Sequence, residues 1–87
     1  MWRIEISDKA EAQIMALDKS IRQRIIKFLR ERVIQHPDPG ALAEPLTGPL
    51  RGLSRFRVGD YRIICDIQKE ILFVLVLEVE HRRDVYR

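Results

Sequence analysis

The chain has little of several features that would assign it to a known structural class at once. A single cysteine, Cys65, among 87 residues excludes a disulfide-stabilised scaffold. No apolar run approaches the roughly 20 residues that a membrane-spanning helix needs, so we expect no membrane partner. The sequence has no metal-ligand spacing and no glycine-rich phosphate loop, and neither a metal nor another cofactor is expected. Because no signal-peptide pattern follows Met1, the expected location is the cytoplasm.

What is present is the composition of one small globular domain, which we expect to span residues 1–87. The chain is 46% hydrophobic and 33% charged, a balance that argues against disorder. Its formal net charge of +3 fits nucleic-acid binding without proving it. In the last third of the chain arginine is frequent and lysine sparse. This bias favours geometric recognition of phosphate, because the planar guanidinium fork matches phosphate oxygens.

A β-hairpin in that last third is the most informative local pattern. Residues 53–58 and 61–68 alternate between apolar and polar side chains, and Gly59-Asp60 joins them. A two-residue loop that begins with glycine favours a type II′ turn, which places Val58 opposite Tyr61. Side chains on strands alternate between the two faces of a sheet. We therefore predict a core face with Phe56, Val58, Ile63, Cys65 and Ile67, and an opposite face with Arg55, Arg57 and Arg62.

The same register places Arg57 directly opposite Arg62. Like charges at a cross-strand pair destabilise a sheet by up to roughly 1 kcal/mol. One interpretation is a solvated strand face whose arginines are screened by salt. The other is an anion site, most plausibly for phosphate, since arginine stays charged at any relevant pH.

The first half of the chain predicts a strand followed by two helices. Residues 2–6 alternate as a short strand, and Ser7-Asp8 begins a helix over about 9–17 with Asp8 as a capping residue. Asp18 then caps a second helix over about 19–35, which ends before Pro37. The apolar stripe of this second helix contains Ile21, Ile25, Phe28, Leu29 and Val33.

The other side of the second helix is strongly basic. It is either a solvated helix face or a second patch that follows a nucleic-acid backbone. Its cationic residues are Arg22, Arg24, Lys27, Arg30 and Arg32.

These elements predict an α+β fold with the order β-α-α-β-β-β. Residues 37–49 hold all four prolines and form a connecting loop, and residues 71–77 are uniformly apolar, as in a central strand. Both helices have one apolar stripe, so we expect a two-helix hairpin packed on one face of a largely antiparallel, twisted sheet. The arginine face is expected to stay open, as a seat for an RNA strand.

Three segments together resemble the RelE/ParE superfamily of type II toxin–antitoxin toxins, and its RelE branch in particular. They are residues 46–53 (LTGPLRGL), 55–64 (RFRVGDYRII) and 81–86 (HRRDVY). The hairpin and the closing segment are specific, whereas the helices are not. The resemblance covers essentially the whole chain and implies a single RelE-like toxin domain with the RelE-like microbial RNase fold.

The resemblance implies an mRNA interferase that enters the A site of the ribosomal 30S subunit and inhibits translation. In that family the 2′-hydroxyl of the message attacks the adjacent phosphate, and no metal is needed. The implied partners are the ribosome, the mRNA and a RelB-like antitoxin in a hetero-oligomer. The alternatives are a ParE-like, non-catalytic inhibitor of DNA gyrase and a binding module without toxicity.

The resemblance also implies a set of site residues. Such cleavage needs a base for the 2′-hydroxyl, positive charge for the phosphorane and an acid for the leaving oxygen. Arg62 and Arg82 are expected to hold the non-bridging oxygens, and Tyr86 to stack on a base or assist proton transfer. The expected phosphate-binding residues are Arg55, Arg57, Arg51 and Arg83.

The identity of the base depends on the register of the last strand. Arginine does not readily lose its proton and the phenol of Tyr86 is a poor base, so His81 is the base candidate. A two-residue loop at Lys69-Glu70 puts His81 on the arginine face. A three-residue loop over residues 68–70 puts Arg82, Glu78 and Glu80 there instead, because a one-residue slip inverts every side chain. Glu78 and Glu80 are therefore further base candidates.

Overall fold

The computed structural model describes residues 1–85 of the chain, and the side chains of residues 1–83. Its five strands form one sheet with the spatial order β1-β5-β4-β3-β2, in which β1 runs parallel to β5 and the other neighbours are antiparallel. The predicted α+β fold with a largely antiparallel sheet is therefore confirmed. The elements are β1 (Arg3–Ile6), α1 (Asp8–Met15), α2 (Lys19–Lys27, continued by a π-helical segment, Phe28–Val33), β2 (Glu44–Pro45), β3 (Ser54–Val58), β4 (Tyr61–Gln68), β5 (Phe73–His81) and α3 (Arg82–Val85).

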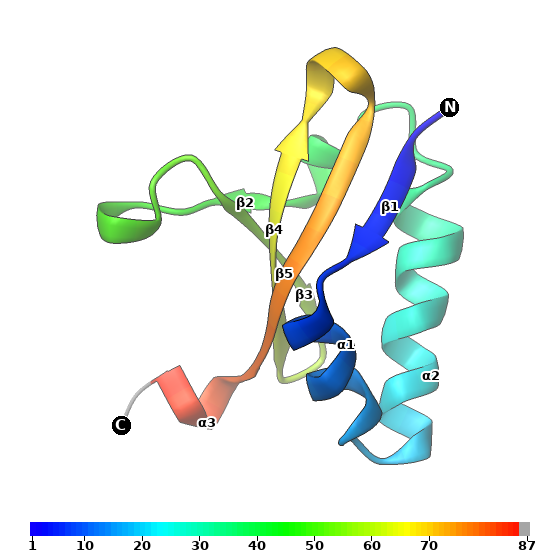
Figure 1. The fold of residues 1–87 in the computed structure, drawn as a ribbon, viewed down its shortest axis with the longest axis vertical. Coiled ribbons are helices and arrows are strands. Elements are labelled where there is room, and N and C mark those ends of the chain that lie inside the picture. Colours follow the sequence, from blue (N-terminus) through cyan, green and yellow to red (C-terminus); the bar gives the residue numbers. More distant parts are fainter. Residues whose placement is uncertain (86–87) are drawn as a thin grey trace.

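The core lies between the sheet and the two helices, α1 and α2 (Figure 1). The predicted core face of the hairpin is confirmed, and Phe56, Ile63 and Cys65 have no exposed surface. The apolar stripe of α2 meets this face through Ile25, and its continuation does so through Val33. No helix within residues 1–85 is long and apolar enough to cross a membrane.

The helix starts were predicted at the right places, but the capping chemistry differs. Ser7, not Asp8, caps α1, because the Ser7 hydroxyl accepts the backbone N–H of Ala10 at 3.1 Å. The same hydroxyl donates to the carbonyl of Leu77 in β5 at 2.9 Å. Asp18 occupies the N-cap position of α2 but makes no side-chain capping bond. Ser7 therefore ties the start of α1 to the sheet.

The predicted register of the β3–β4 hairpin is confirmed at every pair from Arg55↔Ile64 to Val58↔Tyr61. Gly59 has φ +58°, and it is the one residue of the two-residue turn with a positive φ, as a type II′ turn requires. A side chain at this position would also come within 3.0 Å of a guanidinium nitrogen of Arg24. Glycine therefore serves both the turn and the approach of α2 to it.

The connection between β4 and β5 differs from both predicted loops. Gln68 pairs with Phe73, so the loop contains the four residues 69–72, and β5 begins at Phe73 rather than at residue 71. A β-bulge then leaves Leu77 without a partner, because Ile64 pairs with Glu78 and Cys65 with Val76.

The bulge decides which side chains of β5 face each side of the sheet. Directly opposed residues share a face, and Glu80 is opposite Arg62 while His81 is opposite Tyr61. Glu80 therefore lies on the arginine side of the sheet, and His81 lies on the helix side. The placement of His81 on the arginine face, which a two-residue loop would give, is wrong.

We expected the arginine face to be open, but it is not open along its whole length. Arg62 is 6% exposed and its neighbour Ile64 is 4% exposed, so the centre of this face is covered. The predicted loop over residues 37–49 contributes a short edge strand, β2, which pairs Glu44 with Arg55. The accessible arginines of the hairpin are consequently those of β3.

Candidate functional site

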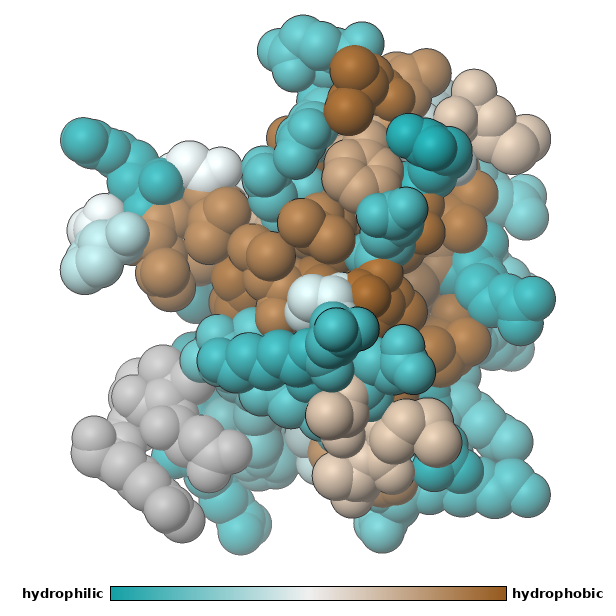
Figure 2. Space-filling view, in the orientation of Figure 1, coloured by the Kyte–Doolittle hydropathy of each residue, from teal (hydrophilic) through white to brown (hydrophobic). Residues whose placement is uncertain are grey.

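Three guanidinium groups gather on the side of the sheet that faces away from the helices, and we call Arg55, Arg57 and Arg62 the arginine cluster. Arg55 and Arg57 are two residues apart on β3, and Arg62 of β4 is the cross-strand partner of Arg57. All three therefore share one face. Hydrophilic side chains also gather over the lower end of the sheet, where β5 leads into α3, below a broad apolar area (Figure 2).

A carboxylate that sequence reasoning did not identify lies inside this cluster. The Nε–H of Arg57 donates to Glu44 Oε1 at 2.5 Å, and a terminal nitrogen of Arg55 is 3.5 Å from Glu44 Oε2. The hydrogen bond from Arg57 and the positive charges of both arginines hold the pKa of Glu44 below its ordinary value of 4.5. Glu44 thus offsets part of the repulsion within the cluster.

Arg62 is the most protected member of the cluster. It lies in β4, a central strand, between Arg57 on β3 and Glu80 on β5. A buried charge is costly unless oppositely charged or polar groups surround it, and Glu80 supplies a carboxylate at the same level of the sheet. The predicted site arginines are therefore in two environments, with Arg62 buried and Arg57 exposed.

The C-terminal group of predicted residues lies beside the β3–β4 turn. The backbone N–H of Arg82 donates to the carbonyl of Asp60 at 2.8 Å, which ties the start of α3 to that turn. Asp60, His81, Arg82 and Arg83 line a surface cavity of about 450 Å³. Arg82 and Arg83 are exposed, so both guanidinium groups are accessible from this cavity.

His81 is held by two contacts. Its ring packs edge-on against the ring of Tyr61, with 4.9 Å between centroids, and its Nδ1 accepts the backbone N–H of Arg83 at 3.0 Å. A neutral imidazole whose Nδ1 accepts a hydrogen bond carries its proton on Nε2. In this arrangement the free ring nitrogen is a donor rather than a proton acceptor.

The two carboxylates proposed as alternative bases are placed differently. Glu78 is 3.1 Å from Nζ of Lys9, so it forms an ion pair with α1. Glu80 stands opposite Arg62 on the arginine side. Glu78 is opposite Ile64 and so is on the arginine side as well, but of the three base candidates only Glu80 is directly opposite an arginine of the cluster.

The remaining predicted residues lie outside the cluster. Arg51 is exposed in the connection between β2 and β3, which stands out from the sheet in Figure 1. Tyr86 lies outside the described residues. Within residues 1–85, no group of three or more His, Cys, Asp or Glu side chains is arranged to hold a metal ion.

Cys65 is a structural residue, as its place in the alternating pattern predicted. Its side chain is buried, and its Sγ lies 3.5 Å from the carbonyl oxygen of Ser54. Burial raises the pKa of the thiol to about 12. A thiol with this pKa stays protonated at neutral pH and is a poor nucleophile.

Comparison with known proteins places this arrangement among toxins. A family profile described as "ParE toxin of type II toxin-antitoxin system, parDE" matches residues 4–86. Toxin RelG of Mycobacterium tuberculosis is 38% identical over 50 residues, which are 58% of this chain and 58% of RelG. The match thus spans a little more than half the length of that curated relative.

Solved structures give the same assignment. The RelBE2 toxin–antitoxin complex of Mycobacterium tuberculosis matches with a TM-score of 0.83 and 25% identity, over 93% of this chain and 98% of that chain. The isolated RelE toxin of E. coli matches with a TM-score of 0.71 and 19% identity, over 93% of this chain and 84% of that chain. These similarities confirm the two-helix, five-strand fold.

Proposed function

The chain belongs to the ParE toxin family of type II toxin–antitoxin systems, within the RelE/ParE superfamily, and we propose that it is a ribosome-dependent mRNA endonuclease. The observation that carries this proposal is the arginine cluster, with Arg82 and Arg83 at the adjoining start of α3. An inhibitor that only binds a protein has no need of guanidinium groups in register across two strands. The similarity to toxin RelG and to the RelBE2 complex supports the same assignment.

The proposed reaction is attack of a 2′-hydroxyl of the message on its adjacent phosphate in the ribosomal A site. It leaves a 2′,3′-cyclic phosphate and a 5′-hydroxyl, and subsequent attack of water opens the cyclic ester to a 3′-phosphate. Arg82 holds the non-bridging oxygens, the buried Arg62 lends positive charge to them from within the sheet, and Arg57 with Arg55 positions the strand. These guanidinium groups supply the positive charge that the transition state needs, so the reaction runs without a metal ion. Arg51 and Arg83 bind flanking phosphates, and Tyr86 stacks on a base or assists proton transfer.

For the general base we propose Glu80 in place of His81. Glu80 faces the arginine side at the level of Arg62, whereas His81 faces the helices and its Nδ1 already accepts a hydrogen bond. A base must come within hydrogen-bond reach of the proton that it removes. Glu80 is placed on the side of the sheet where a phosphate bound to the arginine cluster lies, and His81 is not.

The proposed partner is a RelB-like antitoxin in a hetero-oligomer. The neighbouring structures of RelE toxins from M. tuberculosis, E. coli and Pyrococcus horikoshii are complexes with RelB antitoxins. An active ribonuclease has to be restrained in its own cell. An acidic segment of the antitoxin laid over the arginine cluster restrains it by competing with phosphate.

The test is primer extension on an mRNA in a purified translation system, with and without ribosomes. We expect cuts confined to A-site codons and dependent on ribosomes. Absence of cuts in both conditions contradicts the proposal.

A second candidate function is ParE-like inhibition of DNA gyrase, which the family profile favours. The discriminating measurement is gyrase-catalysed supercoiling of a relaxed plasmid. Inhibition of supercoiling together with no RNA cleavage selects this function. The arginine cluster is then a binding surface rather than an active site.

A further inference from the structure

A groove between α2 and the edge of β3 is lined mainly by cationic side chains. It is a cavity of about 350 Å³, and we call it the α2–β3 groove. Four cationic side chains line it, against one acidic side chain, Glu31. The four are Arg24, Lys27, Arg32 and Arg57.

The floor of the groove contains an aromatic ring. Phe28 is half-buried, and its ring meets the ring of Phe56 edge-on with 5.6 Å between centroids. The guanidinium of Arg32 lies over the Phe28 ring, 5.9 Å from its centroid. A guanidinium over an aromatic face is attracted to the ring. The groove thus combines an aromatic ring with cationic side chains.

Because position 59 is a glycine, Arg24 of α2 can lie against the end of the groove. A guanidinium nitrogen of Arg24 lies 3.0 Å from where a side chain at position 59 would begin. Arg24 therefore rests against the β3–β4 turn, at the end of the strand that carries Arg57.

The groove is continuous with the arginine cluster through Arg57, which belongs to both. β2 pairs only with Arg55 and Ser54, so the edge of β3 at Arg57 is not covered by another strand. A chain of phosphates can therefore pass from the arginine cluster, around this edge, into the groove. We propose that the α2–β3 groove binds the phosphate backbone of RNA that continues from the arginine cluster.

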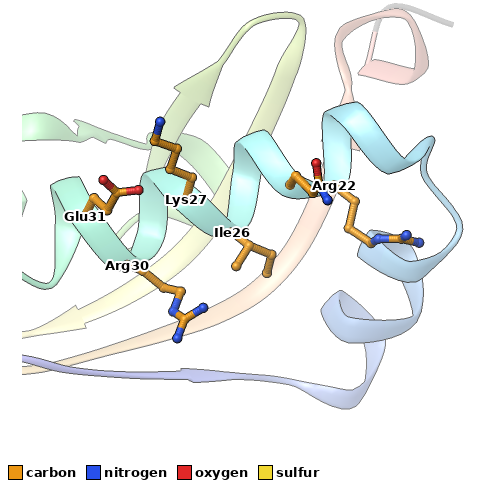
Figure 3. A pocket seen from close by; sticks show the side chains of 6 residues that line it. Arg22, Ile26, Lys27, Arg30 and Glu31 are labelled. Atoms are coloured by element: carbon orange, nitrogen blue, oxygen red, sulfur yellow. The ribbon is translucent and has the colours of Figure 1, made fainter.

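The two sides of α2 differ, which argues against a uniformly solvated basic helix. Lys27 and Glu31 point toward one edge of a cavity on the outer face of α2, and Ile26 and Arg30 point toward its other edge (Figure 3). Ile26 and Arg30 also line a mainly apolar cavity beside β1, which neither Lys27 nor Glu31 lines. The groove side has the cations and the aromatic floor, and the β1 side supplies a control of equal charge.

This inference rests on the proposed RNA-directed function, and a pair of double variants tests it. Lys27→Gln with Arg32→Gln removes two charges from the groove. Arg22→Gln with Arg30→Gln removes two charges from the same helix but from its other side. Each protein is titrated against a short, fully 2′-O-methylated oligoribonucleotide, which cannot be cut, and against vacant 30S subunits by co-sedimentation. Both titrations are repeated over a series of salt concentrations.

We expect the groove variant to lose affinity and the control to stay close to the unmodified protein. For a single strand, each lost phosphate contact lowers the slope of log affinity against log salt by about 0.7, so the groove variant should lose about 1.4. Loss with the oligoribonucleotide supports the inference, whereas loss with 30S subunits alone assigns the groove to ribosomal RNA and overturns it. Arg32→Lys, which keeps the charge, is expected to retain most of the slope.

Equal slopes for the two double variants overturn the inference, because net charge alone would then explain both. That result leaves the proposed cleavage intact, provided that the unmodified protein still cuts mRNA on ribosomes. If the unmodified protein neither cuts mRNA nor binds RNA, both the proposed function and this inference are overturned.

Discussion

Arg57 and Arg62 stand directly opposite each other across β3 and β4, between two carboxylates. Glu44 of β2 accepts the Nε–H of Arg57, and Glu80 of β5 is the cross-strand partner of Arg62. From β2 through β3 and β4 to β5, the side chains at this level of the sheet are therefore negative, positive, positive and negative in turn. The repulsion between the two guanidinium groups is offset within the sheet itself, and this makes a paired-arginine site compatible with a stable fold.

Replacing Arg62 with alanine should abolish cleavage and also destabilise the fold. The side chain is 6% exposed, and removing a buried group costs about 1–3 kcal/mol. For a domain of this size, each kcal/mol lowers Tm by roughly 4–8 °C. Primer extension and thermal unfolding measure the two effects separately, and Arg30→Ala, on the exposed side of α2, is the control. Full cleavage by the Arg62→Ala variant would exclude the proposed site.

Replacing Glu80 with glutamine should slow cleavage more than replacing His81 with glutamine. Loss of a general base costs roughly 10²–10⁴-fold in rate. Single-turnover cleavage on programmed ribosomes is the measurement. The opposite ranking would return the role of base to His81.

Replacing Glu44 with glutamine should strengthen RNA binding. The change removes the carboxylate that holds Arg57 and Arg55, so both guanidinium groups become available to phosphate. We expect a lower Kd for the 2′-O-methylated oligoribonucleotide and a steeper dependence on salt. Glu70→Gln, an equal charge change in the turn between β4 and β5, is the control. Unchanged or weaker binding by Glu44→Gln alone would mean that Glu44 orients the arginines rather than competing with phosphate.

The contribution of Glu44 to stability should depend on pH. Its pKa in the folded protein lies below 4.5, which is its ordinary value, so the ionised form is favoured in the folded state. This contribution is fully present above the unfolded-state pKa and is lost as pH falls through the folded-state pKa. The difference in free energy of unfolding between the unmodified protein and Glu44→Gln should therefore shrink on acidification. A difference that stays constant with pH would contradict this linkage.

Cys65 should be unreactive in the folded protein. Burial raises the pKa of its thiol to about 12, so very little thiolate forms at mildly alkaline pH, and access is blocked as well. A thiol-specific disulfide reagent should label the protein slowly in buffer and stoichiometrically in denaturant. Rapid labelling of the native state would show that β4 opens locally.

The sequence predicted the β3–β4 hairpin in full because its signals are local. A glycine-led two-residue turn and two alternating runs determine the register, and with it the positions of Arg57 and Arg62. The helices were predicted from the spacing of apolar residues, and both end a few residues before the predicted positions, at Met15 and at Val33.

What sequence reasoning missed depends on residues far apart in the chain. The bulge at Leu77 is supported by α1, since Gln13 accepts the N–H of Val79 at 2.7 Å and Ser7 donates to the carbonyl of Leu77. The sequence of β5 alone does not predict these hydrogen bonds to Gln13 and Ser7. Glu44 was missed for a related reason, because β2 is two residues long and its position depends on pairing with β3.

The bulge at Leu77 also bears on how chains of this family should be aligned. Leu77 is an extra residue that bulges out of β5 and leaves the pairing on either side of it in register. A relative that lacks this residue and has a straight last strand therefore presents the same side chains to the arginine cluster. An alignment without a gap at this position would equate Glu80 with the residue that corresponds to His81. A single gap opposite Leu77 restores the correspondence of acid–base groups between such relatives.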